Sequence, residues 1–164
     1  MSRVESLAEG PTELDRVWGK RREYYAIFMG DFNDSIARVN PALLELCRIR
    51  IAQLVESEFD LSLRYEPAEL SEEKITAIPD YAESALFSDR ERAVLEYTEQ
   101  FVIQSSSISD DDVARVQAHV TPEEFIYLTK ALGVIDQFAR ANSAFRIAEA
   151  RTVPPSMPAF TVRT

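Results

Sequence analysis

The spacing of apolar residues along the chain predicts helices. Apolar side chains three and four positions apart form one helical stripe at Leu44, Cys47, Ile51 and Leu54. A longer segment, expected to end near Arg151, has the same spacing at Phe125, Leu128, Leu132, Ile135, Phe138 and Phe145. No segment shows a convincing alternation of period two, which is the pattern of a half-buried strand. The pattern therefore predicts an all-helical fold.

Helix-start signals agree with this spacing. A Ser, Thr or Asn at the N-cap accepts a hydrogen bond from a backbone N–H that has no partner inside the helix. An acidic residue three positions later completes a capping box, and Pro is favoured at the first helical position. These signals predict helix starts after Thr12, Asn40, Ser88, Ser109 and Thr121.

A chain of 164 residues fits a single domain. We expect residues 1–39 to form an N-terminal helical segment that packs on the core, and residues 40–151 to form the main helical domain. Residues 152–164 contain three prolines, which disfavour a helix and predict an extended tail. The tail is expected to fray, or alternatively to lie as an arm on a neighbouring subunit.

Charge and composition limit the partners that the chain can have. The formal net charge of −10 repels phosphate backbones and anionic headgroups, so we expect no nucleic-acid partner and no membrane partner. No apolar run approaches the roughly 20 residues that span a bilayer, and the first residues lack the apolar core of a signal peptide. These features predict a cytoplasmic protein.

The residue types that bind metals or form disulfides are scarce. Cys47 is the single cysteine and His119 the single histidine, so we expect no internal disulfide, no metal site and no cofactor. Cys47 lies on an apolar helical stripe and is expected to be a buried thiol. His119 precedes a helix start and is expected to be exposed at the end of the preceding helix.

Four segments resemble, in their order and spacing, the carboxymuconolactone decarboxylase and alkylhydroperoxidase D-like family. They are Leu43–Leu54, Leu70–Ile75, Leu86–Ala93 and Val134–Asn142, and together they cover roughly residues 40 to 150. The resemblance implies an alkylhydroperoxidase D-like helical bundle that forms a homo-oligomer. A group of aromatic residues could supply the subunit interface or belong to the core: Trp18, Tyr24, Tyr25, Phe28 and Phe32.

In the peroxidase members of that family, a glutamate is followed after eleven residues by a cysteine, then by a second cysteine and a histidine. The resemblance places this glutamate at Glu45, the cysteines at Ser57 and Asp60, and the histidine at Arg64. Only Glu45 matches. Peroxide reduction requires a thiolate and a second thiol that resolves the oxidised sulfur, so we expect peroxidase activity to be lost.

Two hypotheses account for the replaced motif. In the first, the site has become structural: Ser57 and Asp60 have the spacing of a helix cap, and Arg64 pairs either with Asp60 or with Glu45. In the second, Glu45, Asp60 and Arg64 are catalytic, with a carboxylate pair beside a guanidinium that binds a small acidic ligand and moves a proton. Such an enzyme would be a non-redox lactone decarboxylase or hydrolase.

Overall fold

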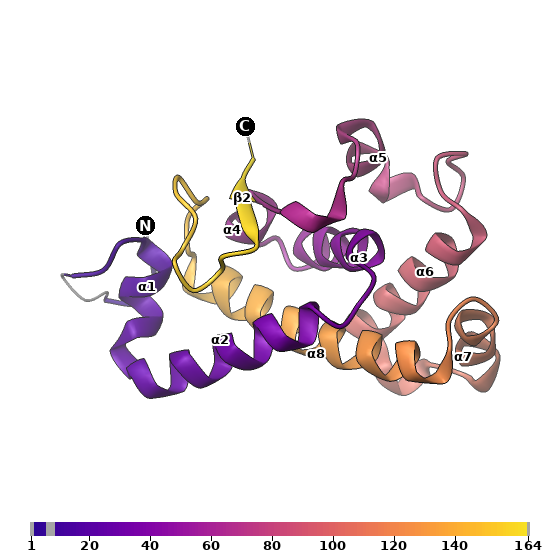
Figure 1. Cartoon of the computed structure of the whole chain (residues 1–164), viewed down its shortest axis with the longest axis horizontal. Coiled ribbons are helices and arrows are strands. Elements are labelled where there is room, and N and C mark those ends of the chain that lie inside the picture. Colours follow the sequence, from indigo (N-terminus) through magenta and orange to yellow (C-terminus); the bar gives the residue numbers. More distant parts are fainter. Residues whose placement is uncertain (1, 6–8, 164) are drawn as a thin grey trace.

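The computed structural model describes residues 2–5 and 9–163, and within these residues the chain is mainly helical (Figure 1). Its α-helices are α1 Glu13–Trp18, α2 Arg22–Ile36, α3 Pro41–Leu54, α4 Glu58–Leu61, α5 Glu72–Thr76, α6 Asp89–Gln104, α7 Asp110–Gln117 and α8 Pro122–Phe145. Its strands are β1 Leu63–Tyr65 and β2 Phe160–Val162. The predicted helical fold class is confirmed.

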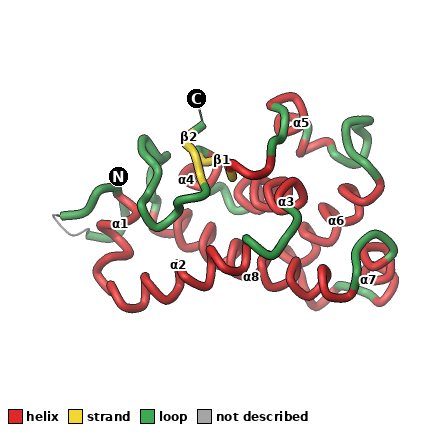
Figure 2. Tube along the Cα trace, viewed as in Figure 1, coloured by secondary structure: helices red, strands yellow, loops and turns green. Residues whose placement is uncertain are grey.

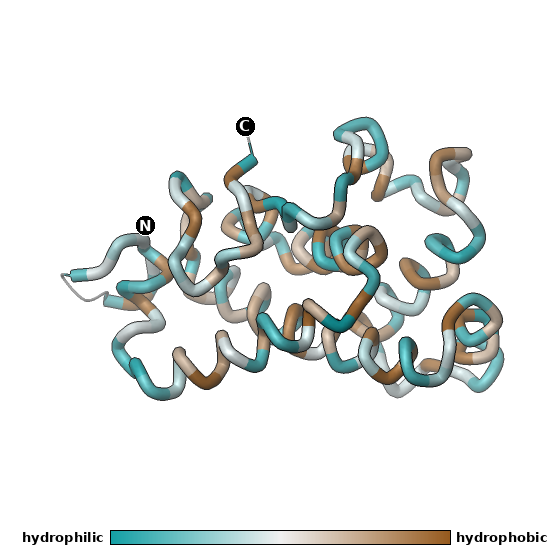
Figure 3. Tube along the Cα trace, in the orientation of Figure 1, coloured by the Kyte–Doolittle hydropathy of each residue, from teal (hydrophilic) through white to brown (hydrophobic). Residues whose placement is uncertain are grey.

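Helix α3 lies at the centre of the bundle, where it packs against α6 and α8, while α2 runs along α8 (Figure 1). Three residues of the apolar stripe of α3, Leu44, Cys47 and Ile51, are each at 0% exposure, and Leu54 at the end of the helix is partly buried. Apolar stretches recur at intervals along the helices in Figure 3, as expected for helices that bury one face. Burial of this stripe makes α3 the element around which the others are arranged.

The predicted N-caps are present, and each cap side chain accepts a hydrogen bond from the helix backbone, at Thr12, Asn40, Ser88, Ser109 and Thr121. The predicted end of the last helix near Arg151 is wrong. Helix α8 ends at Phe145 because Arg146 adopts a left-handed conformation, with φ of 55°. Residues 147–152 are therefore free to cross over toward α1.

The C-terminal tail packs on its own chain. Strand β2 pairs antiparallel with β1, with Leu63 opposite Val162 and Tyr65 opposite Phe160 (Figure 2). Phe160 is 3% exposed and Met157 is 1% exposed, so the tail contributes to the core. The expectation of a frayed tail is wrong, whereas the two short strands leave the helical fold class unchanged.

The N-terminal aromatic residues divide between core and surface. Phe28 and Phe32 are buried and pack against Phe138, whose ring lies 5.8 and 5.1 Å from theirs. Trp18 and Tyr25 pack against the same core, whereas Tyr24 is 52% exposed. Within the described residues, none of the helices has the length and apolarity needed to cross a membrane.

Candidate functional site

Glu45, the residue that the sequence resemblance assigns to the glutamate of the family motif, is enclosed in the protein interior. Glu45 lies on α3, one turn before Arg48, and both side chains are almost fully buried, at 1% and 2% exposure. Arg48 donates from Nε to Glu45 Oε2 at 2.6 Å and from an Nη to Oε1 at 2.8 Å. This two-pronged geometry is the strong form of the arginine–carboxylate pair. The carboxylate of Glu45 is therefore held by a neighbour on its own helix.

Arg48 also ties α3 to the segment that follows it. Its Nη1 donates to the backbone carbonyl of Asp60 at 2.6 Å, and its Nη2, which also donates to Glu45, donates to the carbonyl of Leu63 at 2.8 Å. The guanidinium lies 5.5 Å from the ring of Phe160 on β2. Burial alone would lower the pKa of Arg48, but the charge and hydrogen bonds of Glu45 outweigh it, so the pKa is raised. Arg48 thus joins α3, α4, β1 and β2 at one point.

Sequence reasoning missed Arg48, although a signal was present. Arg48 lies between Cys47 and Ile49 on α3, and an arginine on a buried helix face requires a partner. Glu45 lies three positions earlier, which is a spacing that brings two helical side chains together. A glutamate and an arginine three positions apart on a helix rich in apolar residues were the recognisable pattern.

The two positions of the missing cysteines form a buried helix cap, as the structural hypothesis predicted. Ser57 is the N-cap of α4 and its hydroxyl oxygen accepts the backbone N–H of Asp60 at 3.4 Å. The same hydroxyl donates to the Asp60 carboxylate, which also accepts the side-chain amide of Asn142 at 3.1 Å. The indole of Trp18 donates to the other end of that amide at 3.1 Å. The cap therefore belongs to a buried chain of hydrogen bonds, which links α1, α4 and α8.

Burial raises the pKa of Asp60 above its ordinary value of 3.8, and the hydrogen bonds from Ser57 and Asn142 and the charge of Arg48 offset part of this effect. Desolvation favours the neutral form of a carboxylic acid. Asp60 is 3% exposed, and its carboxylate lies among groups of the protein rather than at an opening. These surroundings fit a structural acid.

Arg64 pairs with neither of its two predicted partners, Asp60 and Glu45. Helix α4 ends at Leu61, so Arg64 lies in β1 and not one helical turn after Asp60. Its guanidinium donates to the carbonyls of Leu61 and Leu63 and lies 3.5 Å from the carboxylate of Glu72. Burial, together with the charge of Arg163, lowers the pKa of Arg64. The predicted triad of Glu45, Asp60 and Arg64 is thus not assembled around a common centre.

Glu45 and Arg64 nevertheless border one cavity of about 250 Å³, which Asp60 does not reach. The cavity lies beside β1, and Tyr65 and Glu72 also line it. Burial, with a smaller contribution from the charge of Glu45, raises the pKa of the Tyr65 phenol. Glu45 therefore borders an opening, although its side chain is almost fully buried.

Cys47 is buried, as predicted. Its thiol accepts a hydrogen bond from the Thr98 hydroxyl at 3.2 Å, and burial raises its pKa to about 12. Only the thiolate is a nucleophile, so such a thiol reacts poorly at neutral pH. His119 is exposed beyond the end of α7, also as predicted.

With this geometry in view, comparison with solved structures defines the class of fold. The chain superposes with a TM-score of 0.72 on a crystal structure from Agrobacterium tumefaciens, with 22% identity over 80% of this chain and 94% of the other. That structure is described as a protein of unknown function and a candidate antioxidant defence protein AhpD. The fold is accordingly alkylhydroperoxidase D-like.

The sequence comparison defines the family. The chain is 30% identical over 138 residues to the uncharacterized protein YnjA of Escherichia coli strain K12, and the match covers 80% of this chain and 76% of that protein. The chain belongs to the same family as YnjA. No protein-family model matches it.

Proposed function

We propose that this chain is an alkylhydroperoxidase D-like protein that has lost peroxidase activity and acts as a helical homo-oligomer. The observation that carries the proposal is the buried cap at Ser57 and Asp60. A hydroxyl and a carboxylate cannot form the sulfenic acid and disulfide that hydroperoxide reduction by this fold requires. The remaining thiol, Cys47, lies elsewhere on α3 and has its pKa raised by burial to about 12.

The test is turnover of hydroperoxide with a dithiol reductant, in the purified protein and in Cys47→Ser. We expect both proteins to consume peroxide at the rate of the reductant alone. The assay needs a working thiol peroxidase as a positive control. Turnover that depends on Cys47 would overturn the proposal, since it would show that the buried thiol reaches substrate.

The homo-oligomer part of the proposal rests on α2. Tyr24 and Ile27 lie three residues apart on one face of this helix and are 52% and 74% exposed. Exposed apolar side chains on one face favour association with another surface. Light scattering coupled to size-exclusion chromatography should give a mass above 18.6 kDa, and Ile27→Lys should lower it. A monomer at all concentrations contradicts this part alone.

A second candidate function is non-redox acid–base chemistry at the 250 Å³ cavity beside β1. The observation that favours it is the presence of a carboxylate, a guanidinium and a phenol on one cavity wall, from Glu45, Arg64 and Tyr65. A guanidinium there could hold an acidic substrate while a neighbouring group exchanges a proton. Hydrolysis or decarboxylation of small acidic lactones, lost in Arg64→Gln, would favour this candidate over the scaffold.

A further inference from the structure

The segment that follows α8 crosses the surface of the bundle and leads to β2 (Figure 2). Residues 153–163 of this segment are called the C-terminal strap below. Its buried side chains are spaced three residues apart, at Pro154, Met157 and Phe160. Two turns set this spacing, because the Met157 N–H donates to the Pro154 carbonyl at 2.9 Å and the Phe160 N–H to the Met157 carbonyl at 3.2 Å. The strap is thus attached to the bundle by one row of inward side chains.

Polar contacts hold the strap at two places. Near its start, the Ser156 hydroxyl lies 2.7 Å from the Tyr25 phenol oxygen, and the Ser156 carbonyl accepts the Asn33 amide at 2.8 Å. At its end, β2 pairs with β1 over three residues. A two-stranded pairing of this size is marginally stable without further packing. These contacts lie outside the packing of α3 against α6 and α8, which forms the centre of the bundle.

The strap covers the buried charge pair of α3. The ring of Phe160 lies 5.5 Å from the guanidinium of Arg48 and 5.3 Å from the ring of Tyr65. Arg48 in turn holds the Glu45 carboxylate. The next residue of the strap, Thr161, lines the 250 Å³ cavity that Glu45 borders. Removal of the strap would therefore uncover Arg48 and open one wall of this cavity.

The cavity beside β1 is small while the strap is in place. Sites for small molecules usually measure roughly 300–1,000 Å³, whereas this cavity measures about 250 Å³. Its other walls come from α3, β1 and residues 66–75. Helix α3 is fixed at the centre of the bundle, so a larger cavity requires the movement of a surface segment. The strap is a surface segment that reaches both this cavity and Arg48.

We propose that the C-terminal strap opens and closes as a unit while the helical bundle stays folded, and that its opening gives a small ligand access to Glu45 and Arg48. A peripheral segment with few buried contacts opens at a lower free energy than the whole protein unfolds. The proposal rests on the second candidate function, because it concerns access to the same cavity. The opening is measured without enzymatic turnover, so the strap and the acid–base activity can fail separately.

The test is hydrogen exchange of the full chain, followed by NMR at single amides. The Glu66 N–H donates to the Ala159 carbonyl at 2.9 Å, and the Arg163 N–H donates to the Ser62 carbonyl at 2.8 Å. These two hydrogen bonds join the strap to the residues that flank β1, so both break when the strap opens. We expect the two amides to share one protection factor, about a hundredfold or more below that of Ile51 in α3.

A variant loosens the strap alone. Phe160→Ala removes its largest inward side chain, so the protection of the Glu66 and Arg163 amides should fall about tenfold or more relative to that of Ile51. Phe87→Ala is the matched control, because Phe87 is also 3% exposed but belongs to a separate core cluster. The control should lower the protection of Ile51 and leave that of the other two amides unchanged. If either variant fails to fold, the exchange of the parent protein decides the question.

Access to Glu45 is measured separately, by coupling glycine ethyl ester to carboxylates with a carbodiimide and locating the products by mass spectrometry. Coupling at Glu45 should be slow in the parent protein and about tenfold or more faster in Phe160→Ala, in step with the loss of protection. Exposed Glu83 is the internal standard and should react equally in both proteins. Two results would overturn the proposal: Glu66 and Arg163 amides protected as strongly as Ile51, or coupling at Glu45 that stays unchanged when the strap loosens.

Discussion

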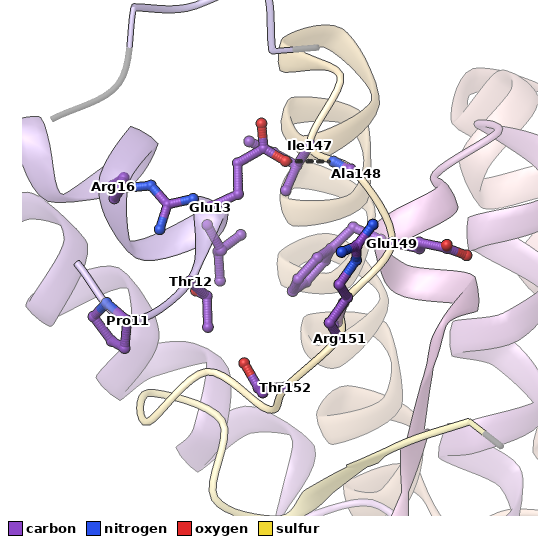
Figure 4. A pocket seen from close by; sticks show the side chains of 12 residues that line it. Pro11, Thr12, Glu13, Arg16, Ile147, Ala148, Glu149, Arg151 and Thr152 are labelled. Carbon is purple, nitrogen blue, oxygen red and sulfur yellow. Dashed lines mark hydrogen bonds between the residues drawn. The ribbon is translucent and has the colours of Figure 1, made fainter. Parts of the chain in front are cut away.

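Two charged regions of this molecule differ in the surroundings of their charged groups. Around Glu45 and Arg48, each guanidinium and carboxylate is buried and bonded to another group of the protein. Arg16 and Arg151, in contrast, line a cleft between α1 and residues 147–152 (Figure 4). A buried charge must be paired to be tolerated, so it holds the fold together, whereas a charge beside an opening remains available to a ligand. The same residue types thus hold the structure together in one region and lie beside an opening in the other.

The largest effect should come from breaking the buried pair. Arg48→Met leaves the Glu45 carboxylate buried without a partner and removes the donor to the carbonyls of Asp60 and Leu63. We expect a loss of about 3–5 kcal/mol in the free energy of unfolding, as for other buried pairs that lose one member. Urea denaturation followed by circular dichroism measures it. The matched control is Arg38→Met, which breaks an exposed pair with Asp34 and should leave stability unchanged.

A double variant separates the charge from the packing. Glu45→Gln with Arg48→Met removes both charges, so it should cost less than Arg48→Met alone, because no unpaired charge is left inside. If the double variant is less stable than the single one, the penalty does not arise from the stranded carboxylate, and the electrostatic account of this region is wrong.

The next effect concerns the link between the helix cap and α8. Asn142→Ala removes the donor to the Asp60 carboxylate and the acceptor of the Trp18 indole. We expect a loss of about 2–3 kcal/mol, since buried polar groups that lose their partners carry a desolvation penalty. Thermal unfolding of the variant, with the fluorescence of the single Trp18 as the probe, measures both the stability and the local change.

A smaller effect should appear in the pH dependence of stability. Because the pKa of Asp60 is raised above 3.8, the folded state holds its proton more tightly than the unfolded state. The contribution of Asp60 to stability therefore falls as pH rises from about 3.8 through the folded pKa. Asp60→Asn removes this dependence, so the free energy of unfolding of the variant should increase relative to that of the parent protein as pH rises. Parallel curves for the two proteins would contradict this assignment.

The smallest effect on stability is expected from a substitution in the cleft between α1 and residues 147–152. Arg151→Gln should change the free energy of unfolding by no more than about 0.5 kcal/mol, because the residue is exposed. Urea denaturation of Arg151→Gln and Arg48→Met in parallel compares their free energies of unfolding in one experiment. A large loss of stability in Arg151→Gln would show that Arg151, like Arg48, is needed for the fold, and would contradict the difference between the two regions.

The helices and their caps could be predicted from the sequence because the signals are local. Thr121, Pro122 and Glu124 lie within one turn of each other, and the structure has the predicted capping box there. Strands β1 and β2 are three residues each, too short for a visible alternation, and they pair across about a hundred residues of intervening chain. No local pattern identifies such a pairing, and so the packed tail was missed.

The site was predictable only in part, for a similar reason. Ser57 and Asp60 form the cap that their spacing indicated. Arg64 was placed one helical turn after Asp60, but α4 ends at Leu61 and the chain turns into β1. The partner of Glu45 is Arg48, three residues away, whereas the resemblance to the family indicated Arg64, farther along the chain.

We expect the alkylhydroperoxidase D-like fold of this chain to hold no reactive sulfur. Treating the protein with hydrogen peroxide and dimedone, which traps a sulfenic acid, and then locating the adduct by mass spectrometry tests this expectation. The native protein should give no adduct on Cys47 and the protein unfolded in urea a clear one, because burial raises the pKa of the thiol to about 12. An adduct on Cys47 in the native protein, at a rate similar to that in urea, would contradict it.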